Sequence, residues 1–152
     1  MRRLFFVLIA FMVASADHAG AQTVTSPADD RAAIRQAALD YIEGWYEGNA
    51  ARMESSLHPE LAKRIVRTNP QNRRSQLDQM SALSLVLGTR RGGGKDTPPA
   101  RQQKDVIILD VFENAASAKV VASDWVDYMH LAKSNGRWVI VNVLWEMKPG
   151  AN

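Results

Sequence analysis

The stretch from Asp105 to Lys148 constrains the fold most strongly, because it holds three long apolar runs separated by short polar breaks. The runs are residues 106–112, 118–131 and 138–145. They are rich in valine, isoleucine and aromatic residues, which favour strands, and the breaks contain Asn and Gly, which favour tight turns. The pattern predicts antiparallel strands joined by hairpins, near 104–113, 117–133 and 137–147.

The turn between the last two runs, Ser134-Asn135-Gly136-Arg137, admits two registers. We predict a three-residue loop with Gly136 in the left-handed conformation. That register opposes Ala132 to Trp138, His130 to Ile140, and Tyr128 to Asn142. A two-residue Asn-Gly turn would move every partner by one and reverse the faces, so that Asp127 and Met129 would face inward.

The N-terminus has the features of a secretory signal peptide. Arg2-Arg3 precedes an apolar run from Leu4 to Ala14, and small residues follow up to Ala21. The apolar run is too short to span a bilayer. We predict a signal peptide over 1–21, a short linker over 22–27 and one domain over 28–148. The protein is then periplasmic or secreted and meets the membrane only during export.

The first part of the domain reads as helical. Ser26, Asn49 and Ser81 each precede a segment with helical spacing of apolar residues, and serine and asparagine are good helix caps. Three helices are predicted, near 27–47, 49–56 and 81–88. Residues 61–67 read as a short strand, and 90–103 as a loop rich in glycine and charge. Helices followed by long strands indicate the α+β class.

Charge and composition exclude some functions. Residues 63–104 hold most of the basic side chains, from Lys63 to Lys104, which we interpret as a solvated surface or as a rim for an anionic ligand. Export and the separate placement of the aromatic residues argue against a nucleic-acid partner. The chain has no cysteine, and its histidines do not lie at metal-ligand spacing, so we expect no metal site and no cofactor.

Few residues are candidates for chemistry. His58 and His130, the histidines beyond the signal peptide, are the candidate catalytic bases, although a histidine in such a place is more often a satisfied, partly buried structural group. Asp124 and Asp127 flank Trp125 and point to opposite faces of a strand. A carboxylate that faces an apolar cavity would have a raised pKa and could move protons, whereas an edge position would leave it a solvated side chain.

Two segments carry a family resemblance. Residues 127–145 and the stretch 41–53 with Leu57-His58-Pro59 resemble the putative lumazine-binding proteins, a branch of the nuclear transport factor 2-like, SnoaL-like superfamily. The resemblance covers about 28–148. It implies a cone-shaped α+β barrel, with three N-terminal helices packed on a curved antiparallel sheet, and a homodimer formed through the sheet. The interface expected from the strand pattern is Val139, Val141, Val143 and Trp145.

Function remains open at this level, because the superfamily includes both enzymes and binding domains. We expect an apolar pocket between the helices and the sheet, lined by Tyr41, Trp45, His58, Tyr128, His130 and Asn142. The favoured hypothesis is an exported domain that binds a small molecule. The alternatives are a cofactor-free lyase or isomerase with a pocket histidine as base, and a non-catalytic dimerisation domain.

Overall fold

The computed structural model describes residues 26–150; the predicted signal peptide lies outside them. Along the chain come α1 (Pro27–Glu47), α2 (Ala50–Ser56), β1 (Leu57–Thr68), β2 (Ser75–Ser81), α3 (Ala82–Arg90), a short 3-10 turn η1 (Pro99–Arg101), β3 (Lys104–Phe112), β4 (Ala115–Ala122), β5 (Trp125–Ser134) and β6 (Arg137–Met147). None of the helices in this part of the chain is long and apolar enough to cross a membrane.

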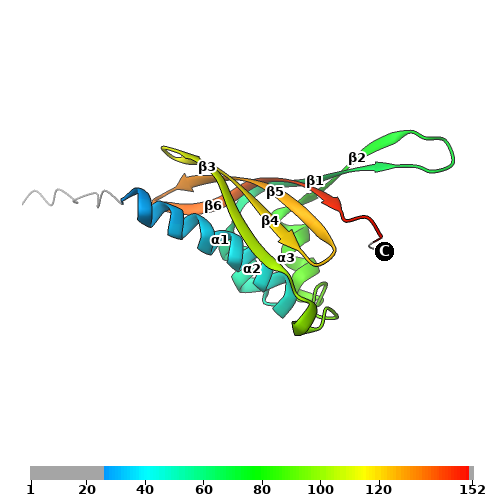
Figure 1. Ribbon diagram of the computed structural model, residues 1–152, viewed down its shortest axis with the longest axis horizontal. Coiled ribbons are helices and arrows are strands. Elements are labelled where there is room, and N and C mark those ends of the chain that lie inside the picture. The colour runs from blue at the N-terminus through cyan, green and yellow to red at the C-terminus, as the bar shows by residue number, and fades with distance from the viewer. Residues whose placement is uncertain (1–25, 151–152) are drawn as a thin grey trace, which may run out of the picture.

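The six strands form one sheet in the order β2-β1-β6-β5-β4-β3, and the helices cover one of its faces (Figure 1). The α+β class is confirmed. Four details differ from the expectation. The predicted strand 117–133 is two strands, β4 and β5, because the chain bends at Ser123-Asp124. The sheet curves without closing into a barrel, since β2 and β3 remain edge strands, and β1 runs parallel to β6 because α2 leads directly into it. The third helix follows β2, so it is not N-terminal to the whole sheet.

The predicted helix starts are confirmed. The Ser26 hydroxyl accepts a hydrogen bond from the Asp29 amide, and the Asp29 carboxylate accepts one from the Ser26 amide, which completes a capping box. Asn49 caps α2 through the Arg52 amide, and Ser81 caps α3 through the Ser84 amide. Each cap satisfies backbone donors that a helix start leaves without partners.

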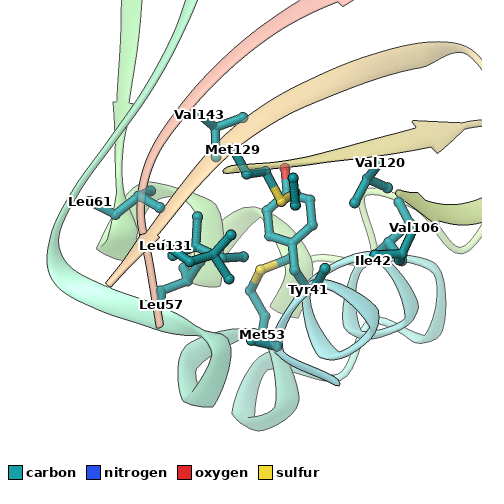
Figure 2. Close-up of a cluster of buried hydrophobic side chains, with 14 of the residues drawn as sticks. Tyr41, Ile42, Met53, Leu57, Leu61, Val106, Val120, Met129, Leu131 and Val143 are labelled. Carbon is teal, nitrogen blue, oxygen red and sulfur yellow. The ribbon is translucent and has the colours of Figure 1, made fainter. Parts of the chain in front are cut away.

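The core lies between α1, α2 and the inner face of the sheet. Figure 2 shows its side chains converging from helices and strands, with Tyr41 of α1 and Met53 of α2 below Met129 and Leu131 of β5. These four side chains are at most 2% exposed. Their burial supplies the apolar contact that holds the helical layer on the sheet.

The predicted register of the β5–β6 hairpin is wrong. The turn has two residues, Asn135 and Gly136, and both have positive φ (50° and 77°). Such turns match the right-handed twist of the strands they join. Ser134 therefore pairs with Arg137, and Leu131, not His130, lies opposite Ile140. His130 pairs with Asn142 and Tyr128 with Leu144.

A β-bulge in β6 changes which side chains face the core. Leu131 pairs with Ile140 and His130 with Asn142, so Val141 is the extra residue. An extra residue reverses the alternation beyond it. Ile140 before the bulge and Val143 after it are therefore both fully buried. The predicted interface set is corrected accordingly, because Val143 and Trp145 pack against the core of their own chain.

Candidate functional site

A cavity of about 370 Å³ lies between α1, α3 and the β1, β2, β5 and β6 strands. Its walls are mainly apolar and aromatic. Four aromatic side chains line it: Tyr41, Trp45, Trp125 and Trp145. Leu85 of α3, with Met80 and Met147 of the strands, completes its apolar wall. Ser84 adds a hydroxyl group, and Arg91 and Asp124 add charge. An apolar enclosure with a few polar groups is the usual form of a small-molecule site.

Lys63 brings a positive charge into this cavity. It lies on β1 between the inward-facing Leu61 and Ile65, and only 5% of its side chain is exposed. Its Nζ donates to Asp127 Oδ1 and to the Tyr41 hydroxyl oxygen, at 2.5 Å in each case. The other oxygen of Asp127 accepts a hydrogen bond of 2.7 Å from Trp125 Nε1. Lys63, Asp127 and Tyr41 thus form a buried polar cluster, held by α1, β1 and β5.

Aromatic rings surround the ammonium group of this cluster. Lys63 Nζ lies 4.8 Å from the centroid of a Trp145 ring, 5.2 Å from that of Tyr41 and 6.0 Å from that of Trp125. The negative faces of the rings attract a cation at these distances. The indole nitrogen of Trp145 is itself buried and has no hydrogen-bond partner among the described residues.

Burial dominates the proton affinities in the cluster. It lowers the pKa of Lys63 from its usual 10.5, and the negative charge of Asp127 opposes that change. Burial raises the pKa of Tyr41 well above its usual 10.0, and the charge of Asp127 adds to the effect. Tyr41 is therefore a neutral phenol, and Lys63 loses its proton more readily than an exposed lysine does.

The six predicted lining residues do not come together. Tyr41 and Trp45 line the cavity, as expected. Tyr128 is 51% exposed, and His130 lies beside Asn142 on the outer face, where Arg64 donates to the Asn142 side chain. The two-residue turn is the reason, since it reverses both faces of β5.

His58 does not line this cavity either. It sits at the start of β1, and its Nδ1 accepts a hydrogen bond of 3.2 Å from the Glu60 amide. Among the described residues, no three or more His, Asp or Glu side chains gather as metal ligands would.

Lys63 and Asp127 are the site residues that the sequence interpretation did not select. In the sequence, Lys63 belongs to the basic segment that we interpret as surface. Asp127 faces inward only with a two-residue turn, which is not the register that we predict. A signal was present, because Lys63 stands between Leu61 and Ile65 on one face of the predicted strand 61–67. A charge at a core position of a strand requires a partner inside the fold.

The comparisons with known proteins identify the family. The sequence model described as "Putative lumazine-binding" matches residues 29–146. The chain belongs to this family. No functionally curated protein matches it.

Solved structures share the fold of this family member. A nuclear transport factor 2-like protein of unknown function from Shewanella baltica is 18% identical, with a TM-score of 0.63, and the match covers 83% of this chain and 99% of that one. One from Silicibacter pomeroyi is 14% identical, with a TM-score of 0.62 and coverages of 82% and 100%. One from Methylobacillus flagellatus is 18% identical, with a TM-score of 0.61 and coverages of 82% and 97%. At these identities the likeness establishes the fold alone.

Gly93 and Gly94, in the loop after α3, pack against Trp45, and we predict that neither position tolerates an added side chain. A Cβ at Gly94 would lie 2.4 Å from Trp45 Cδ1 and 2.6 Å from the Trp45 carbonyl oxygen. Gly94→Ala is therefore expected to lower the free energy of unfolding by about 1–3 kcal/mol, as overpacking does. Urea unfolding followed by tryptophan fluorescence measures the change.

Gly88→Ala is the matched control for this loop. Its Cβ would lie 3.6 Å from the same indole ring, an ordinary contact, and alanine favours the helix in which Gly88 sits. We expect it to be neutral or stabilising. Equal destabilisation by both substitutions would contradict the packing of the loop on Trp45.

Proposed function

We propose that this protein is an exported domain that binds a small, planar, partly apolar molecule in the cavity between α1, α3 and the sheet. The observation that carries the proposal is the cavity wall itself, which combines three tryptophans with the buried Lys63, the partner of Asp127. Aromatic walls stack on flat ligands, and the polar cluster can orient a ligand through hydrogen bonds. The family name suggests lumazine-like heterocycles as the first compounds to test.

The placement of the histidines favours binding over the lyase or isomerase alternative. That alternative required His58 or His130 as the base inside the cavity, and neither lines it. The titratable groups that stand together at the cavity are Lys63, Asp127 and Tyr41, and each is engaged with another member of the cluster. A dimerisation domain without a ligand remains as the outcome of a negative binding test.

Ligand binding is expected to change tryptophan fluorescence and to raise the melting temperature. Three of the four tryptophans line the cavity, so an aromatic ligand will contact most of the emitting side chains. Trp45→Ala is expected to weaken binding by about 1–2 kcal/mol through lost stacking. Fluorescence titration and thermal shift, with lumazine and 2-naphthalenemethanol among the compounds, measure both effects.

Substitutions on the outer face are the controls for this test. Tyr128→Ala and His130→Gln remove side chains that do not line the cavity, and they are expected to leave affinity unchanged. If these two variants weaken binding and Trp45→Ala does not, the ligand sits on the outer face. If no compound binds to the folded protein, the binding proposal fails.

We also propose that the protein is a homodimer through the outer face of the sheet. Apolar side chains about half exposed lie there on neighbouring strands: Val66 of β1, Leu77 of β2, Tyr128 of β5 and Leu144 of β6. Such a face on a monomer would be a large apolar patch in contact with water. Light scattering is expected to give a dimer for the wild type at micromolar concentration and a monomer for Leu144→Asp. A wild-type monomer would exclude this interface.

A further inference from the structure

Lys63 stands apart from the other lysines of the described chain, because it alone is buried. The others are exposed or half-buried, and Lys104 and Lys133 pair with carboxylates near the surface. Lys63 instead places its amine at the wall of the largely apolar cavity, beside an aspartate and a phenol. This combination places a nucleophile, a proton acceptor and a hydroxyl group at one point.

A contribution to stability does not by itself account for the Lys63–Asp127–Tyr41 cluster. A buried ion pair gains little or nothing over well-packed apolar side chains of the same volume, because both charges lose their hydration. The positions that flank Lys63 on the inner face, Leu61 and Ile65, are apolar and buried. Apolar residues at both position 63 and position 127 would fill the same volume without this cost, so the retained amine is consistent with a chemical role.

We propose that Lys63 is a nucleophile that holds an aldehyde or ketone ligand in the cavity as a covalent iminium ion. The inference rests on the proposed function, since it requires that a small molecule enters this cavity, and it adds the chemical class of that molecule. Desolvated lysines in apolar pockets are the amines that form such adducts with carbonyl compounds.

The groups around Nζ can carry out each proton transfer of the step. Asp127 accepts a proton from the Lys63 ammonium, and the neutral amine attacks the carbonyl carbon. The electron pair of the C=O bond moves to oxygen, and the Tyr41 hydroxyl passes the proton from nitrogen to that oxygen. Asp127 returns its proton to the hydroxyl group, water leaves, and the nitrogen lone pair forms the C=N bond. An ammonium and a carbonyl thus become an iminium and water, with no change of oxidation state.

The product fits the site as well as the free lysine does. The iminium keeps the single positive charge of Lys63, so the ion pair with Asp127 is retained. The charge also stays among the rings of Tyr41, Trp125 and Trp145. The nearby tryptophan walls favour an aromatic substituent on the carbonyl carbon over an aliphatic one.

Reductive trapping tests the proposal directly. The full protein is incubated with 2-naphthaldehyde and sodium cyanoborohydride at pH 7, and the reduced adducts are located by peptide mass spectrometry. Burial lowers the pKa of Lys63, so more of its amine is neutral at this pH, and the cavity holds the aldehyde beside it. Lys63 is therefore expected to be labelled several-fold faster than any surface lysine. Labelling of the lysines in order of exposure, with Lys63 unmodified, would overturn the proposal.

Two variants and a competitor separate chemistry from folding and binding. Lys63→Arg keeps the charge and is expected to lose the fast adduct, whereas Lys119→Arg on β4 is expected to keep it. If Lys63→Arg does not fold, the wild type still answers the question, since 2-naphthalenemethanol fills the cavity without forming an imine. It is expected to protect Lys63 alone, and failure to protect a labelled Lys63 would place the reaction outside the cavity.

The outcomes distinguish this inference from the function on which it rests. Binding of 2-naphthalenemethanol to the wild type, without any adduct at Lys63, would sink the covalent inference and leave the binding function standing. Absence of both binding and adduct would sink both. Fast labelling of Lys63 with protection by the alcohol supports both.

Discussion

Replacing Asp127 with leucine is expected to lower the free energy of unfolding by about 3–5 kcal/mol, the cost of breaking a buried ion pair by removing one partner. The substitution leaves the Lys63 ammonium in the cavity wall without its counter-charge, and it leaves Trp125 Nε1 without its acceptor. Lys63 can release its proton, which limits the loss. Urea unfolding of the purified variant measures the change.

The double variant Lys63→Met with Asp127→Leu is the decisive comparison. It removes both charges and fills their volume with apolar atoms, so it is expected to recover most of the stability that the single variant loses. Asp124→Leu removes an exposed carboxylate at the cavity edge. It is the control for loss of a carboxylate and should stay within about 1 kcal/mol of the wild type. A single variant as stable as the wild type would show that the pair is not buried in solution.

Truncating Met53 to alanine is expected to destabilise the protein by about 2–5 kcal/mol, the range for large-to-small changes in a packed core. Met53 is fully buried in the core cluster, and its backbone contacts α1 at Gly44, where a Cβ would lie only 2.9 Å from the Met53 amide nitrogen. So close an approach of two helices leaves little freedom for the site to collapse. Thermal and urea unfolding report the loss.

Met80→Ala is the matched control for that truncation. Met80 is half-buried and lines the cavity, so its side chain adjoins space that is already unfilled. Its removal enlarges the cavity without opening a new one, and we expect a cost below about 1 kcal/mol. Similar losses in both variants would mean that the cavity is filled by side chains in solution.

The local parts of the fold follow from sequence because local chemistry determines them. Ser26, Asn49 and Ser81 mark the helix starts. A short polar side chain before a segment with helical spacing can accept a hydrogen bond from the first free backbone amides of the helix. The strands β3 and β6 follow from runs of β-branched residues between turn residues. The predicted single strand 117–133 is wrong, because Ser123-Asp124 divides it into β4 and β5 without a glycine or proline to mark the break. Strand β2 is ambiguous in the sequence, because its residues are mostly polar and it lies at the sheet edge.

The inward faces of β5 and β6 could not be read from the sequence in the same way. Both alternations of 138–145 are apolar, so the pattern does not say which one is inside. The register then depends on the turn, and Asn135-Gly136 serves a two-residue or a three-residue loop. The bulge at Val141 adds a second reversal for which the composition gives no sign. Tyr128 and His130 were misplaced for these reasons.

The sequence predicts some of the residues at the cavity and misses others. Tyr41 and Trp45 lie on the apolar side of a well-marked helix, so their inward direction follows from helical spacing alone. Lys63 and Asp127 meet only because β1 inserts between β2 and β6 in parallel to the latter. The position of Lys63 in the strand pattern shows that a partner is needed, but residues so far apart in the chain leave no local trace of which partner it is.

The extra residue in β6 also bears on how this cavity arises and disappears among related chains. Trp145 and Met147 reach the cavity because they lie beyond Val141, while Leu144 before them and Glu146 between them turn to solvent. A chain with one residue fewer at this point would carry the same aromatic residue on the outside of its sheet. Insertion or deletion of one residue would therefore move this aromatic side chain into or out of the cavity wall, without any substitution. When related chains are aligned after residue 141, the face of β6 on which each position lies must therefore be established before the residue types are compared.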